Sequence, residues 1–312
     1  MSLDAGEFRT HLELSASVAG VALPEIVLPD EHDLLAGRMR LHYLDWGTAG
    51  LPPVVFLHGG GLNAHTWDLV CASLRRERHC LALDQRGHGE SEWSPQMDYT
   101  IESQVEDLDA FFAAMKLSRF VLIGMSLGGV NALAWAGKHG ARLAGLVIVD
   151  VGPEVRTEGV RKIAAFTSDA TPLDSVEQYV DRAMAFNPRR NRELLRRSLL
   201  HNLRRMPDGR YMWKYDQRHR GRAPDPAAQA HRREVLWSAV DTVPCPTLVV
   251  RGGQSDVFHD EDAERMVARL KKGRWTRIEG AGHTVQGDNP AGLLVSLREF
   301  LGATGAARSA RG

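Results

Sequence analysis

Short apolar runs alternate with amphipathic stretches along most of the chain. In five places about four apolar residues follow one another, and a glycine or an aspartate comes within two residues of each run. Fully apolar strands of this length are typical of a parallel sheet that is covered on both faces. We therefore predict buried strands at 54–57, 80–83, 120–123, 146–149 and 247–250.

The segments between these runs carry helical patterns. Apolar residues recur at intervals of three and four through 101–115, where Thr100 is placed as an N-cap, and again through 263–270 and 290–301. Apolar and polar residues alternate over 39–46, which predicts a further strand. Because strands and helices alternate, the sequence predicts an α/β fold, a doubly wound and mostly parallel sheet.

Two segments fall outside this alternation. Residues 1–36 show no sustained period and are interpreted as an N-terminal arm, either packed on the body or a disordered lead. Residues 153–237 contain helical patterns and several prolines but no apolar strand run, so we predict a mainly helical insertion there. The core is then expected at 37–152 and 238–302, and the tail 303–312 is expected to be disordered.

Composition narrows the function classes. The chain has 312 residues with 39 basic and 39 acidic side chains, and a general nucleic-acid binder would usually show a basic excess. No segment approaches the apolar length of a membrane helix, and no signal peptide is recognisable. Three scattered cysteines, Cys71, Cys80 and Cys245, form neither a disulfide framework nor a zinc site. We expect a cytoplasmic protein without a nucleic-acid or membrane partner, and a homodimer is left open.

A nucleophile motif follows the third predicted strand. Gly124-Met125-Ser126-Leu127-Gly128 matches G-x-S-x-G, between a buried strand and a helical stretch. The glycines allow the sharp turn that lifts Ser126 to the carboxyl edge of the sheet, where such sheets bind ligands. The alternative is a packing turn of small residues. A dinucleotide-binding loop is rejected because serine occupies a position that requires glycine.

A serine hydroxyl needs a base, an acid and an oxyanion site. His283, in a glycine-flanked loop before the last helix, is the predicted base. Asp256 follows the fifth strand and gives the chain order Ser, Asp, His, so it is the predicted acid; Asp150, at another strand end, is the alternative. The predicted oxyanion donors are the N–H groups of Leu127 and Gly60, with Gly61 as second choice for the latter. A merely flexible glycine turn is the alternative.

Together these pieces resemble an α/β-hydrolase-fold serine hydrolase of the branch with a helical cap after the sixth strand. The resemblance is carried by His58-Gly59-Gly60, the segment 84–91, the segment 124–129, Asp256 and Gly282-His283. It implies no metal and no organic cofactor, and it implies that 84–91 is mainly a structural turn. Epoxide hydrolases and haloalkane dehalogenases of this fold place an aspartate at the position of Ser126, so both are disfavoured.

The expected activity is hydrolysis of a carboxylic ester or lactone through an acyl-enzyme, with a small-molecule ester or lactone as substrate. One alternative is a C–C bond hydrolase of a ring-cleavage diketone, although such enzymes usually carry Asn before the serine and Trp after the histidine, where this chain has Met125 and Thr284. Another is a ligand receptor with slow turnover. Candidate substrate-binding residues are Gly61, Met125, Tyr211, Trp213 and Tyr215, although packing of the cap against the body also explains the three aromatic residues.

Overall fold

The computed structural model describes residues 4–169, 171–188, 190–218 and 225–304. One sheet has the strand order β1-β2-β4-β3-β5-β6-β9-β10, and all neighbours from β4 to β10 pair in parallel. Its strands are β1 (Asp30–Ala36), β2 (Met39–Asp45), β3 (Pro53–Leu57), β4 (His79–Leu83), β5 (Phe120–Met125), β6 (Leu143–Val149), β9 (Thr247–Gly252) and β10 (Gly273–Ile278). Each predicted apolar run lies in one of these strands, and the doubly wound α/β fold is confirmed.

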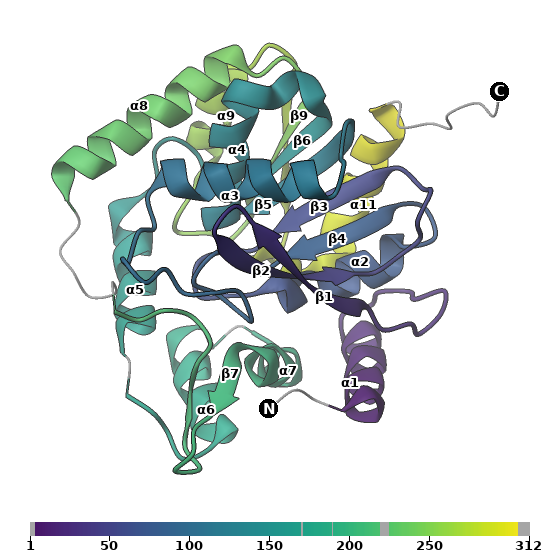
Figure 1. Ribbon diagram of the computed structural model, residues 1–312, viewed down its shortest axis with the longest axis vertical. Coiled ribbons are helices and arrows are strands. Elements are labelled where there is room, and N and C mark those ends of the chain that lie inside the picture. The colour runs from purple at the N-terminus through teal and green to yellow at the C-terminus, as the bar shows by residue number, and fades with distance from the viewer. Residues whose placement is uncertain (1–3, 170, 189, 219–224, 305–312) are drawn as a thin grey trace.

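Helices cover both faces of the sheet because its central strands are apolar on both sides (Figure 1). One core cluster joins one face to α3 (Ile101–Ala114), α4 (Leu127–His139), α8 (Pro226–Thr242) and α9 (Asp260–Arg269). The other cluster joins the opposite face to α1 (Ala5–Val18), α2 (Asp68–Leu74) and α11 (Pro290–Ala303). Short helical turns are η1 (Ala64–Trp67), η2 (Gly140–Arg142) and α10 (Val285–Asp288).

The cap follows β6 and lies beside the body, below it in Figure 1. It contains α5 (Thr157–Ser168), α6 (Val176–Phe186), α7 (Arg192–Asn202) and a hairpin of β7 (Leu203–Arg205) with β8 (Tyr211–Trp213). The cap has an apolar cluster separate from those of the body, and Tyr179 and Trp213 belong to it. The predicted limits of 153–237 need correction, since α8 belongs to the body. Its Leu236 and Val240 are buried in the core. Ala239 packs so tightly on α4 that a Cβ built on Gly137 would lie 2.7 Å from the Cβ of Ala239.

The N-terminal segment packs on the body from residue 4 onward, which is the first of the two possibilities considered for 1–36. The strand β1 pairs with β2 along its whole length, from Asp30↔Asp45 to Ala36↔Met39. The helix α1 begins with a capping box at Asp4 and buries Leu12 completely. The sequence did not reveal β1 because it is an edge strand whose first four residues are polar and exposed.

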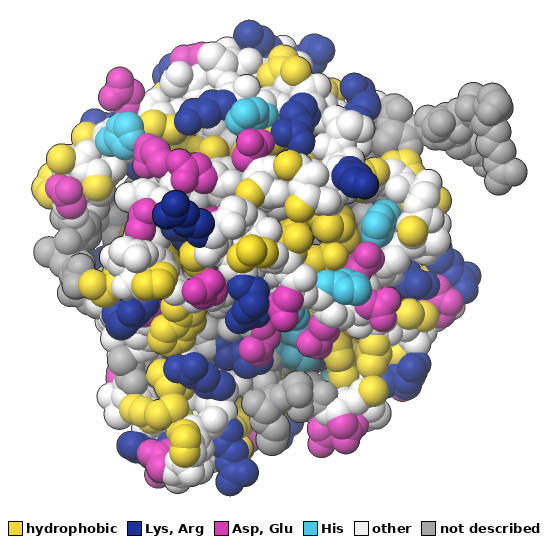
Figure 2. Space-filling view, viewed as in Figure 1, with side chains coloured by type: hydrophobic (Ala, Val, Ile, Leu, Met, Phe, Trp, Pro, Cys, Tyr) yellow, Lys and Arg dark blue, Asp and Glu magenta, His cyan; other side chains and the backbone are white. Residues whose placement is uncertain are grey.

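The face shown in Figure 2 carries basic and acidic side chains intermixed. None of the described helices is both long and apolar enough to span a bilayer. At the C-terminal end, α11 extends to Ala303, so the predicted disordered tail overlaps its last residue; residues 305–312 lie outside the described part of the chain.

Candidate active site

Ser126 stands on a tight turn between β5 and α4. Its backbone lies in a strained region with φ of +52°, and such strain concentrates at functional sites. A Cβ built on Gly124 would lie 2.2 Å from the carbonyl oxygen of Gly128, and one built on Gly128 would lie 2.4 Å from that of Leu57. Only glycine fits at these two positions, so the spacing of the motif is a steric requirement of the turn.

His283 connects Ser126 to a buried carboxylate. It lies in the loop between β10 and α10, with Nε2 3.0 Å from Ser126 Oγ and Nδ1 2.8 Å from Asp150 Oδ2. Asp150 directly follows β6 and is fully buried. The hydroxyl, imidazole and carboxylate thus form one hydrogen-bonded chain, the arrangement that activates a serine nucleophile.

The prediction that Asp256 orients His283 is contradicted by these contacts. The side chain of Asp256 is 54% exposed and forms an ion pair with Lys162 of α5, with Nζ 3.2 Å from Oδ2. Its loop runs beneath the cap, where a Cβ built on Gly159 would lie 2.3 Å from the carbonyl oxygen of Asp256. The residue first considered as the alternative, Asp150, occupies the place beside the imidazole.

The loop after β9 nevertheless contributes to the site. Gly252 N–H donates to Asp150 Oδ1 at 2.8 Å, and Ser255 Oγ donates to Asp150 Oδ2 at 2.5 Å. Together with His283, three donors satisfy the buried carboxylate, as a polar group without access to water requires. Sequence analysis missed Ser255, because one serine in a loop that also carries the expected aspartate gives no separate signal.

The glycine loop after β3 lies against the nucleophile turn. A Cβ built on Gly59 would be 3.4 Å from Ser126 Cβ, and Gly128 N–H donates to His58 O at 3.0 Å. Within the described chain, the backbone N–H groups of Gly60 and Leu127 donate no hydrogen bond, and both residues are partly exposed. They are available for a developing negative charge beside Ser126.

His58 holds this glycine loop in place. Its Nδ1 donates to Gly59 O at 2.9 Å, while its Nε2 accepts from Gln85 N–H at 3.0 Å, so the contacts select one neutral tautomer. Burial lowers the pKa of His58, which also favours the neutral ring. His58 is therefore a positioning residue for the loop that carries Gly60.

The segment 84–91 makes structural contacts. Arg86 forms a two-pronged ion pair with Asp107 at 2.5 and 2.8 Å. The buried Asp84 carboxylate accepts from Ala64 N–H at 2.6 Å and pairs with His42 Nδ1 at 2.9 Å. These contacts tie β2, β4 and η1 together beneath the glycine loop.

The candidate substrate-binding residues separate into two groups. The ring of Tyr215 would lie 3.5 Å from a Cβ on Gly61, and its hydroxyl donates to Thr167 O at the end of α5. Gly61 and Tyr215 thus lie together where the cap meets the glycine loop. Met125 is buried under the loop. Trp213 and Tyr215 are buried in the cap cluster, and Tyr211 is partly buried against it.

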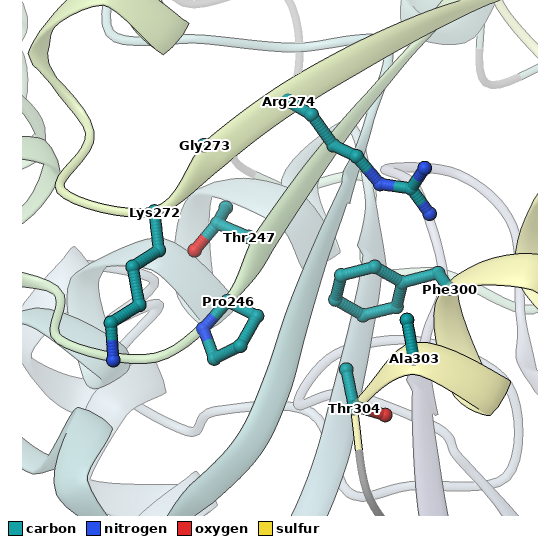
Figure 3. A pocket seen from close by; sticks show the side chains of 8 residues that line it. All are labelled: Pro246, Thr247, Lys272, Gly273, Arg274, Phe300, Ala303 and Thr304. Carbon is teal, nitrogen blue, oxygen red and sulfur yellow. The ribbon is translucent and has the colours of Figure 1, made fainter.

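A pocket and a cluster of potential metal ligands lie away from Ser126, His283 and Asp150. A pocket of about 160 Å³ opens at the amino ends of β9 and β10, lined by residues such as Pro246, Lys272 and Phe300 (Figure 3). It is at the opposite edge of the sheet from Ser126 and carries no catalytic group. Among the described residues, donors close enough to share a metal ion gather at His65, Asp68 and His201.

Known proteins share this architecture. A family model described as "Alpha/beta hydrolase family" matches residues 54–296. The esterase Rv0045c of Mycobacterium tuberculosis is 34% identical over 92% of this chain and 93% of its own length, and its crystal structure superposes with a TM-score of 0.77 over 96% of this chain and 100% of that one, at 31% identity.

Two further matches bear on function. A second structure of the mycobacterial esterase, described as "Transition metal inhibition and structural refinement", matches with a TM-score of 0.76 at 31% identity over 97% of this chain and 100% of that one. A 3-hydroxybutyrate-oligomer hydrolase of Cupriavidus necator is 27% identical over 86% of this chain and 95% of its own. From the family match and these relatives, the chain belongs to the alpha/beta hydrolase family.

Proposed function

We propose that this protein hydrolyses carboxylic esters or lactones through an acyl-enzyme on Ser126. The observation that carries the proposal is the hydrogen-bonded chain from Ser126 Oγ through His283 to Asp150. The similarity to a mycobacterial esterase and to an oligoester hydrolase supports an ester as the bond that is cleaved.

The mechanism follows from the positions of these groups. As Ser126 Oγ attacks the ester carbonyl, His283 Nε2 takes its proton. The carbonyl oxygen becomes an oxyanion that the N–H groups of Gly60 and Leu127 stabilise. Asp150 keeps the Nδ1 proton of His283 in place and stabilises the imidazolium. His283 then protonates the leaving alcohol, and a water molecule that it deprotonates releases the acid.

The cap supplies the wall next to the reacting carbonyl. Tyr215 and Thr167 face the Gly61 segment, and the Tyr215 hydroxyl fastens the end of α5 at 3.0 Å. We infer that these two residues limit the size of the acyl or alcohol group on that side of the substrate. The cap is anchored: Asp216 N–H donates to Gly87 O, and Lys214 and Arg197 pair with Glu90 and Asp68 of the body.

A labelling experiment tests the nucleophile. A fluorophosphonate probe should modify the parent protein at one serine, and Ser126→Ala should abolish both the label and the turnover of p-nitrophenyl acetate. Unchanged thermal unfolding of the variant would show that the fold is retained. Labelling that persists in Ser126→Ala would assign the nucleophile elsewhere, and labelling without turnover of any ester in a panel would favour the ligand receptor.

We also propose that transition metal ions inhibit this enzyme. The support is its similarity to the mycobacterial esterase whose structure is described together with transition metal inhibition. Assays with and without EDTA, at increasing Zn²⁺, would test this. Full activity at millimolar Zn²⁺ would refute it.

A further inference from the structure

Three potential metal ligands meet where the cap, the body and the N-terminal helix join. His65 belongs to η1, Asp68 begins α2, and His201 lies near the end of α7. Their donor atoms lie within 4.8 Å of one another. His65 Nδ1 is 3.2 Å from both oxygens of Asp68, and the two imidazole rings stack at 3.8 Å between centroids.

One of these ligands has a nitrogen without a partner. His201 is only 6% exposed, yet its Nε2 makes no hydrogen bond within the described chain. A buried polar atom left unpaired is costly and calls for a ligand or a water. A cavity of about 30 Å³ adjoins the two imidazoles, and it also touches the carboxylate-bearing residues Glu31 and Glu90. This volume is sufficient for one water or one ion.

We propose that His65, His201 and Asp68 bind one divalent transition metal ion of the Zn²⁺ class. Two imidazoles and one carboxylate are a donor set that Zn²⁺ and Co²⁺ take in proteins, with a water completing the coordination. An ion in this place would satisfy His201 Nε2. Binding does not depend on the proposed esterase activity; only the inhibitory effect described below rests on it.

The site must adjust to receive the ion. Donors around Zn²⁺ are about 3.3 Å apart for metal–ligand bonds near 2.0 Å. The three donors here lie within 4.8 Å of one another, so the side chains adjust until their donors reach that spacing. His65 is the less buried of the two rings, so it is the one expected to rotate as its contacts with Asp68 are rearranged. Arg197 already pairs with one oxygen of Asp68, which leaves the other oxygen for the ion and lowers the expected affinity.

The proposed metal site is connected through Asn63 to the loop that carries Gly60. Asn63 caps η1 by accepting from His65 N–H at 3.1 Å, and its amide donates to His201 O at 2.8 Å. Only Gly61 and Leu62 separate Asn63 from Gly60. An ion that draws the two imidazoles together is expected to shift the backbones of η1 and α7, which contact Asn63. Asn63 lies next to the loop whose N–H group is proposed to hold the oxyanion. The expected consequence is a lower kcat with little change in KM.

Direct binding measurements test the site. The full chain, freed of metal with EDTA and dialysed, is titrated with Zn²⁺ by calorimetry and with Co²⁺ by visible absorption. We expect one ion per chain in the parent. Both His65→Gln and His201→Gln should weaken binding by at least about tenfold, the smallest loss typical of disturbed metal sites. The control is His231→Gln on α8, an exposed histidine paired with Glu102 away from the cluster.

The outcomes separate binding from inhibition. Weaker binding in both cluster variants, with the parental affinity in His231→Gln, supports the site. Binding that survives both cluster substitutions but disappears in His283→Gln would place the ion at the triad and overturn the proposal, as would the absence of binding up to millimolar Zn²⁺. His201 is buried, so its replacement by glutamine can destabilise the fold. If the thermal unfolding of His201→Gln has changed, the affinity of the more exposed His65→Gln variant is the test of the site.

Discussion

Replacing Asp150 by asparagine tests the proposed acid most directly. Asp150 Oδ2 accepts from His283 Nδ1 and Ser255 Oγ, and Oδ1 accepts from Gly252 N–H. An asparagine amide would point its NH₂ group at a donor in either orientation. If the NH₂ group faces His283, the ring must carry its proton on Nε2, and it can no longer take the proton of Ser126.

The expected loss is large. In a known triad, the same change leaves the geometry intact and lowers kcat by about 10⁴ through the wrong tautomer, which corresponds to about 5 kcal/mol of transition-state stabilisation. Asp256→Asn is the matched control, with the same change of charge. It breaks an exposed ion pair with Lys162, a contact worth about 0.2–1 kcal/mol, so kcat/KM should change less than about fivefold.

The assay is the hydrolysis of p-nitrophenyl acetate and butyrate by both variants and the parent, with thermal unfolding to confirm that each is folded. A labelling rate with fluorophosphonate gives a second reading of the nucleophile. If Asp256→Asn loses more activity than Asp150→Asn, then the loop after β9 must rearrange in solution, and the assignment of Asp150 is refuted.

Three further predictions concern the surroundings of the triad. Ser255→Ala removes one hydrogen bond to a buried carboxylate, worth about 1.5–3 kcal/mol, and should lower kcat/KM at least about tenfold while Ser255→Thr restores it; equal activity in both would deny Ser255 a positioning role. Tyr215→Ala should shift the preference of acyl chain length more than Tyr211→Ala, because the ring of Tyr215 lies against Gly61; identical rankings would show that Tyr215 does not select substrate. Burial opposes a charge on His42, but its contacts with Asp84 and Glu31 outweigh this and raise the pKa of His42 to about 9. Since the pKa is raised from 6.5, the stabilisation is complete below pH 6.5 and is lost as pH rises through 9. Urea unfolding should show His42→Gln about 3 kcal/mol less stable than the parent at pH 6, and a gap that does not narrow by pH 10 would contradict the charge on His42.

Features that depend on local sequence could be predicted. The five apolar runs form strands because a parallel sheet buried on both faces tolerates few polar residues. The turn that carries Ser126 is recognisable because sterics force glycine at 124 and 128. The histidine beside Ser126 could be placed because His283 follows a strand in a loop with small neighbours. In each case the physical requirement lies within a few residues of the chain.

Features that depend on contacts between distant parts of the chain could not be predicted from the sequence. The helix α8 is much less amphipathic than the cap helices, so its sequence pattern does not indicate which surface it covers. Its contact with α4 assigns it to the body. The strand β1 is polar because it is an exposed edge, so it resembles a loop until its pairing with β2 is known. The cluster of His65, Asp68 and His201 joins two segments more than a hundred residues apart, and no spacing in the sequence indicates it.

The choice between Asp150 and Asp256 shows why the order of residues was insufficient. Strands β6 and β9 are neighbours, with Val149 paired to Val250, so both chain segments leave the sheet side by side near His283. Asp150 comes immediately after the last residue of β6 and turns at once, with φ of +54°. Asp256 comes several residues after β9 ends at Gly252, where the chain has already turned toward the cap. Since Gly252 N–H and Ser255 Oγ hold the carboxylate that β6 supplies, the acid of this site is built from both strand ends. A carboxylate directly after the strand end, such as Asp150, can accept hydrogen bonds from the loop of the neighbouring strand. Asp256 lies farther along that loop, where its side chain is exposed to solvent and pairs with Lys162.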